Sequence, residues 1–119
     1  LQYAGAYNPL YVVSDGELTE IKADKFPIGV NVDGVADDYN NHTIQLKSGD
    51  CVYLFSDGYA DQFGGPKGKK FMYKQLREKL IKLYYQPMLE QKKTLLSIFN
   101  NWKGNEDQVD DVCIIGVRV

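Results

Sequence analysis

Two apolar runs that lie far apart along the chain constrain its fold more than any other feature. Cys51–Phe55 is a nearly continuous apolar run, typical of a strand covered on both faces, and Val112–Val119 is predicted to be a second buried strand. Asp57 follows the first run, whereas Asp110 and Asp111 come immediately before the second. If the two strands are antiparallel neighbours, these carboxylates meet at one edge of a sheet. A parallel arrangement would separate them by about 20 Å.

Carboxylates that meet in this way repel one another unless a cation lies between them. Hard divalent metals take oxygen ligands of this kind, so Asp57, Asp110 and Asp111 are candidate metal ligands. The alternative is that these acids end strands and form turns, because Asp-Gly is a common turn pair and Gly58 follows Asp57. The spacing alone leaves both interpretations open.

The first half of the chain predicts β-structure. Asp15-Gly16 separates two runs of branched and aromatic residues, which is a strong signal for a β-hairpin. Leu1–Tyr7 is a further strand-like run. His42–Leu46 alternates in polarity, and we expect it to form a second hairpin with Cys51–Phe55.

Two helices are predicted in the second half, each with an apolar stripe that faces a core. The stripe of the first is Tyr73, Leu76, Leu80, Leu83 and Tyr84, and that of the second is Met88, Leu95, Phe99 and Trp102. Pro87 separates the two helices, and Gly104 lies where a C-terminal cap is expected. The order of elements predicts an α+β fold in which helices pack on an antiparallel sheet.

Two segments are predicted to be loops. Asn31–Asn41 is acidic and rich in asparagine. Gly64–Lys70 follows a strand and precedes a helix, as a phosphate-binding loop does, but Lys69 comes one residue too early and Lys70 occupies the position of the required Ser or Thr. We therefore expect a solvated, flexible loop, whose lysines could attract an anionic substrate.

Composition and charge exclude several classes of protein. A chain of 119 residues fits one small domain. Its 14 basic and 16 acidic side chains leave a net charge of −2, which argues against a nucleic-acid binder. No apolar run approaches the roughly 20 residues of a membrane-spanning helix. The N-terminus has no signal peptide, so we expect a cytoplasmic location.

Nucleophilic catalysis receives little support from the sequence. Cys51 and Cys113 lie in the apolar runs, and we expect both to be small core residues of a protein from a reducing compartment. His42 is the sole histidine, and we expect it on the surface. The spacing from Cys113 to Arg118 is one residue too short for the phosphate loop of a cysteine phosphatase.

Several motifs in order along the whole chain resemble the C-terminal part of PPM-type metal-dependent serine/threonine phosphatases, specifically the bacterial SpoIIE-like branch. Asp61 stands at the usual Glu position of that branch. The four matching segments are Ala4–Leu10 (family "AGHNP"), Phe26–Val30 ("PLG"), Ser48–Gly58 ("GD…LYTDG") and Asp110–Val112 (the closing "DD").

The resemblance implies a specific fold and chemistry. It implies two antiparallel sheets packed as a sandwich, flanked by helices, with a pair of Mn²⁺ or Mg²⁺ ions between them. Asp57 and Asp110 would be metal ligands and catalytic residues, and Asp111 a neighbouring partner or alternative ligand. The metals would activate a water that attacks the phosphate directly. The implied substrate is a phosphoserine or phosphothreonine on a partner protein, often an antagonist of an anti-sigma factor.

Two departures from the family pattern qualify this expectation. Ala6 stands where many relatives have His. The acidic "D…GHG" motif of the family's N-terminal half does not occur in this sequence, and the chain lacks an initiator Met. We therefore expect residues 1–119 to be the C-terminal portion of one phosphatase domain, and we expect this portion alone to be inactive.

Half of a sandwich would leave apolar strands uncovered, so we expect the isolated portion to form a homodimer. The alternative to a phosphatase is a pseudo-phosphatase or regulatory module, in which the fold survives as a protein-binding surface.

Overall fold

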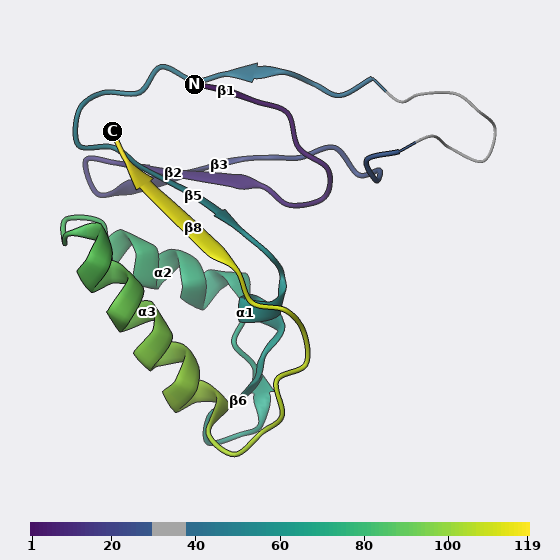
Figure 1. Cartoon of the computed structure of the whole chain (residues 1–119), viewed down its shortest axis with the longest axis vertical. Helices are drawn as coiled ribbons and strands as arrows, with labels where there is room; N and C mark the ends of the chain where they lie inside the picture. The colour runs from purple at the N-terminus through teal and green to yellow at the C-terminus, as the bar shows by residue number, and fades with distance from the viewer. Residues whose placement is uncertain (30–37) are drawn as a thin grey trace.

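The centre of the molecule is a four-stranded antiparallel sheet with helices on one face (Figure 1). The computed structural model describes residues 1–29 and 38–119, so most of the predicted loop Asn31–Asn41 lies outside the described residues. The strand order is β3-β2-β5-β8. The strands are β2 (Leu10–Ser14), β3 (Glu17–Ile21), β5 (Cys51–Phe55) and β8 (Ile114–Arg118).

Two short ribbons and three helices complete the described part of the chain. The ribbons pair β1 (Gln2–Tyr3) with β4 (His42–Thr43), and β6 (Phe63–Gly64) with β7 (Lys69–Lys70). The helices are α1 (Gly58–Asp61), α2 (Tyr73–Leu83) and α3 (Met88–Lys103). No helix in these described ranges has the length and hydropathy needed to cross a bilayer. The α+β class is confirmed.

The hairpin at Asp15-Gly16 is confirmed. Asp15 and Gly16 have φ angles of 50° and 82°. Two positive φ angles in a two-residue turn match the twist of the flanking strands, and Asp-Gly adopts them readily. The turn thereby fixes the register of β2 against β3, with Ser14 opposite Glu17.

The prediction that His42–Leu46 forms a hairpin with Cys51–Phe55 is wrong. β4 pairs with β1, with Gln2 opposite Thr43, and not with β5. Both edges of β5 are already occupied, by β2 on one side and β8 on the other. The alternation of His42–Leu46 could not distinguish between these possible neighbours.

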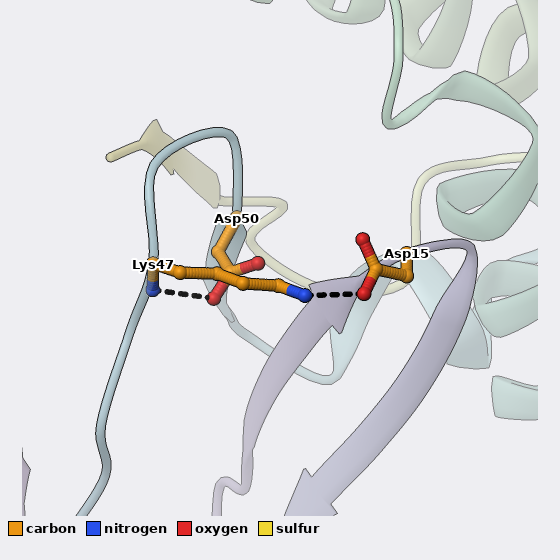
Figure 2. A network of polar contacts seen from close by, with 3 residues as sticks. All are labelled: Asp15, Lys47 and Asp50. Atoms are coloured by element: carbon orange, nitrogen blue, oxygen red, sulfur yellow. Dashed lines mark hydrogen bonds and ion pairs between the residues drawn. The ribbon is translucent and has the colours of Figure 1, made fainter.

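The turn that enters β5 is closed by a buried carboxylate. One carboxylate oxygen of Asp50 accepts a hydrogen bond from the backbone N–H of Lys47 at 2.9 Å (Figure 2). The ammonium of Lys47 in turn pairs with Asp15 in the β2–β3 turn (Figure 2). Gly49 has a φ of 94°, which glycine adopts without strain. These contacts hold the start of β5 beside the end of β2.

Both predicted helices are confirmed, and their apolar stripes pack on the sheet. Pro87 immediately precedes α3, and Gly104 ends it with a φ of 55° and a backbone N–H that donates to the carbonyl of Asn100 at 2.9 Å. Six of the twelve buried residues that the structure describes in the resulting core are aromatic. Its buried members are Tyr11, Val13, Cys51, Tyr53, Phe55, Tyr59, Phe71, Leu76, Leu80, Leu83, Leu95 and Phe99.

Burial of the two central apolar runs differs from the prediction. Cys51, Tyr53 and Phe55 are buried on the helical face of the sheet, but Leu54 on the opposite face is 41% exposed. Ile115 of β8 is 54% exposed. The strands are therefore covered on one face only, because both long helices lie on the same side (Figure 1).

Cys113 is exposed, so its predicted role as a core residue is wrong. Side chains alternate between the two faces of an extended segment, and Val112 and Ile114 pack against the core, so Cys113 lies on the opposite, uncovered face with Ile115. Cys51 is buried, as predicted.

The prediction of a flexible loop at Gly64–Lys70 is also wrong at both ends of this segment. These residues form the β6–β7 hairpin, with Gly64 opposite Lys69.

Candidate functional site

The antiparallel pairing of β5 and β8, on which the candidate site depends, is present. Phe55 at the end of β5 lies opposite Ile114 at the start of β8. The segment that carries Asp57 therefore leaves the sheet at the edge where the segment carrying Asp110 and Asp111 enters it. Figure 1 shows α1 beside the start of β8 at this edge.

Ser56 joins these two segments through hydrogen bonds. Its hydroxyl donates to the carbonyl oxygen of Asp111 at 2.7 Å and accepts from the backbone N–H of Cys113 at 2.9 Å. Its own backbone N–H donates to the carbonyl of Cys113 at 3.0 Å. The ladder between β5 and β8 thus extends, through a side chain, to the residues next to Asp57 and Asp111.

Gly58 allows the segments to approach closely. A Cβ at this position would overlap the carbonyl oxygen of Asp111. Any larger residue would push the start of α1 away from Asp110 and Asp111. The glycine of the Asp57-Gly58 pair is therefore required by contact with the other acidic segment, rather than by turn geometry.

The carboxylate of Asp57 is available for a ligand. Asp57 occupies the N-cap position of α1, yet its side chain makes no capping hydrogen bond, and its backbone carbonyl accepts from the N–H of Asp61 at 2.9 Å. In the opposite segment, one carboxylate oxygen of Asp110 accepts from the N–H of Asp111 at 2.7 Å. All three predicted acids are exposed.

This donor set fits part of a divalent metal site. Carboxylate oxygens from two segments face solvent at one sheet edge, which suits Mn²⁺ or Mg²⁺. Within residues 1–29 and 38–119, however, no group of three or more His, Cys, Asp or Glu side chains is arranged to hold a metal. Two metals would need ligands beyond those that this described part provides.

Tyr73 lies at the margin of the candidate site. Its ring centroid is 6.1 Å from that of Phe55. Burial, followed by the charges of Asp57 and Asp61, raises the pKa of the Tyr73 hydroxyl. A tyrosine hydroxyl is protonated at neutral pH, and these surroundings strengthen that preference.

Two residues that the sequence did not predict in this role, Gln62 and Trp102, support the acidic segment. Gln62 is fully buried, and its side-chain amide donates to the carbonyl of Asp107 at 2.9 Å. The indole N–H of Trp102 donates to the carbonyl of Gln62 at 3.0 Å. No local pattern singles out Gln62, which stands between Asp61 and Phe63 just before two glycines.

The histidine and cysteines do not join this site. His42 belongs to the β1–β4 ribbon, where its ring lies 6.2 Å from that of Tyr3. Cys51 is buried at the far end of β5, and its thiol contacts the carbonyl of Tyr84 at 3.4 Å. The described residues thus show no pairing of His42 with a nucleophile.

Comparison with known proteins identifies phosphatase domains. The family model described as Stage II sporulation protein E (SpoIIE) matches residues 1–119. No curated protein matches the chain. The SiaA-PP2C domain of Pseudomonas aeruginosa is similar in structure, with a TM-score of 0.88 and 34% identity, over 99% of this chain and 46% of that one.

Two structures from Bacillus subtilis share the fold at lower identity. The PP2C phosphatase domain of SpoIIE, solved with a fragment of its regulatory domain, has a TM-score of 0.70 and 22% identity, over 95% of this chain and 32% of that one. A second structure of the SpoIIE phosphatase domain has a TM-score of 0.64 and 20% identity, over 95% and 48%. This chain thus spans less than half the length of each of the three matched chains.

Proposed function

Because the chain belongs to the Stage II sporulation protein E (SpoIIE) family, we propose that it supplies one side of the active site of a metal-dependent protein phosphatase. The proposed reaction is hydrolysis of phosphoserine or phosphothreonine on a partner protein. A phosphorylated antagonist of an anti-sigma factor is the partner class that we propose first.

One observation supports this proposal above the others. The acidic segments at Asp57 and at Asp110–Asp111 lie together at one sheet edge, joined by Ser56. Asp57 and Asp110 are the proposed metal ligands, and Asp111 is an adjacent or alternative ligand. A bound Mn²⁺ or Mg²⁺ would lower the pKa of a coordinated water and stabilise charge on the phosphate.

The residues of the chain have distinct proposed tasks. Asp57 and Asp110 hold and orient the cation through their carboxylates. Ser56 keeps the two segments in register, so that neither ligand moves independently of the other. No side chain needs to act as a covalent nucleophile, since water attacks.

Turnover of a phosphoserine peptide tests the proposal. The complete natural polypeptide that contains these residues is assayed with Mn²⁺, as are its Asp57→Asn and Asp110→Asn variants. Loss of a ligand removes several kcal/mol of charge stabilisation, so we expect each variant to lose at least about 100-fold in kcat/KM. Removing the metal with a chelator should abolish turnover, and added Mn²⁺ should restore it.

Glu78→Gln, an exposed acid in α2, is the matched control and should keep full activity. Turnover that survives both aspartate substitutions would refute the assigned site. The 119-residue chain alone should show no turnover. Its described part has no group of three carboxylates, and a two-metal centre needs such a group.

The second candidate is a regulatory module that binds a partner protein without hydrolysing it. Both candidates fit the lack of a three-acid cluster among residues 1–29 and 38–119, so turnover by the complete polypeptide distinguishes them. The regulatory alternative predicts that the complete polypeptide binds the phosphopeptide but releases no phosphate with any divalent metal.

A further inference from the structure

The β6–β7 hairpin is held rigidly against the end of α3. Gly64 and Gly65 pack so closely against Trp102 that a Cβ on either glycine would overlap the tryptophan. The backbone N–H of Gly65 donates to the carbonyl of Trp102 at 2.8 Å. The hairpin therefore presents its side chains from a fixed position.

The hairpin also borders both acidic segments of the candidate site. Gln62, immediately before β6, binds the carbonyl of Asp107 in the segment that leads to Asp110. On the other side, the Lys70 ammonium pairs with Asp61 at 3.2 Å, one helical turn after Asp57. Figure 1 shows β6 beyond α1 and beside the segment that runs to β8.

The outer surface of the hairpin is basic and partly apolar. Lys67 and Lys69 are exposed, and neither forms a salt bridge with another described residue. Lys70 lies 5.8 Å from the ring centroid of Phe63, which is 41% exposed. Together with Met72, these residues are called the lysine surface below.

Met72 is held in an unusual conformation beside this surface. Its φ of 73° is uncommon for a residue with a side chain, and its N–H donates to the carbonyl of Ala60 in α1 at 2.7 Å. The side chain is 55% exposed. Backbone strain of this kind persists where surrounding contacts enforce it, and it is frequent at binding sites.

We propose that the lysine surface docks an acidic segment of the phosphoprotein substrate, next to the residue to be dephosphorylated. The proposal rests on the proposed function. Asp57, Asp110 and Asp111 give the site negative charge, which repels an approaching phosphoprotein until cations bind. The positive charge of the lysine surface offsets this repulsion and raises the association rate. It also selects substrates with acidic residues on one side of the phosphorylated residue.

Binding without turnover tests the docking separately from the catalysis. A fluorescent phosphoserine peptide with Asp and Glu flanks is titrated with the complete natural polypeptide in a chelator, and its anisotropy is measured. The same peptide with Lys flanks is the comparison. We expect the acidic peptide to bind more tightly, and its affinity to fall steeply with salt, because exposed charges are screened.

Charge reversal at the hairpin is the decisive variant. Lys67→Glu with Lys69→Glu should weaken binding of the acidic peptide by about tenfold, since two attractive pairs become repulsive. Lys79→Glu with Lys82→Glu in α2 changes the net charge equally, away from the hairpin, and should have little effect. Circular dichroism checks that both variants are folded.

The proposal is overturned if the hairpin variant binds the acidic peptide as tightly as the wild type, or if the α2 variant loses as much affinity. It is equally overturned if the lysines bind anionic lipid vesicles while the two peptides bind alike. A polypeptide that shows lysine-dependent binding but no phosphate release with Mn²⁺ contradicts the proposed phosphatase activity and not the docking.

Discussion

A single buried carboxylate, that of Asp50, determines how the chain enters the central strand β5. Hydrogen bonds from the backbone of Lys47 and then from the side chain of Ser14 hold its pKa below the ordinary value of 3.8. The folded state therefore favours the ionised form. This stabilisation is present above pH 3.8 and is lost as the pH falls through the lowered pKa of the folded state.

We expect Asp50→Asn to lower the urea midpoint at pH 7, because the neutral amide accepts the Lys47 hydrogen bond more weakly than a carboxylate does. The difference from the wild type should shrink below about pH 4, where the wild-type carboxylate gains a proton. Urea unfolding followed by far-UV circular dichroism at several pH values measures this.

Asp15→Asn is the control for this prediction. Asp15 also pairs with Lys47, but its side chain is 80% exposed, so its removal should change the midpoint little at any pH. If the urea midpoint of Asp50→Asn stays below that of the wild type by the same amount at acid pH, the charge of Asp50 does not cause the difference in stability.

At the scale of single residues, the sequence predicts the acids of the candidate site but not the residues that hold them in place. Asp57, Asp110 and Asp111 stand at the ends of apolar runs, so the periodicity that predicts the strands also places the acids. Ser56 and Gln62 act through contacts with residues more than forty positions away along the chain. No local pattern encodes such partners.

At the scale of elements, locally determined structure is predicted well. The hairpin at Asp15-Gly16 depends on two residues in its own turn. The two long helices depend on stripes at helical spacing and on Pro87 and Gly104 at their ends. All the information that these elements need lies within a few residues.

Elements that depend on distant partners are predicted poorly. The pairing of β4 with β1 joins segments about forty residues apart, and no turn signal specifies it. The β6–β7 hairpin depends on packing of Gly64 and Gly65 against Trp102 in α3. The sequence around the hairpin, which is rich in glycine and lysine, instead suggested a loop.

At the scale of the whole molecule, the sheet has one covered face and one open face. The radius of gyration is 15.8 Å, whereas a closely packed chain of this length has about 13.5 Å. Ile44 and Leu46 line a pocket with Val12 and Thr19 over part of the open side. The apolar residues left exposed there, called the open face, are Leu54, Ile115, Val117 and Val119.

We predict that the 119-residue chain self-associates through the open face, because exposed apolar side chains on neighbouring strands gain free energy when a second copy covers them. Sedimentation velocity should show a dimer that dissociates on dilution. Ile115→Lys with Val117→Lys should shift the chain to monomer, since charges cannot be buried in such an interface.

Met72→Lys is the control for the dimer. Met72 is 55% exposed but lies beside α1, outside the open face, so this variant should dimerise as the wild type does. A wild-type chain that stays monomeric at the highest concentrations measured would contradict the prediction.

The central claim is that Asp57 and Asp110 bind the same metal ion. Titration calorimetry with Mn²⁺ alone, on the complete natural polypeptide, tests it most directly. We expect Asp57→Asn and Asp110→Asn each to weaken Mn²⁺ binding by at least about tenfold, and the double variant to lose less than the sum of the two free-energy changes. Asp15→Asn should bind Mn²⁺ normally. Unchanged affinity in either site variant, or strictly additive losses, would contradict the shared site.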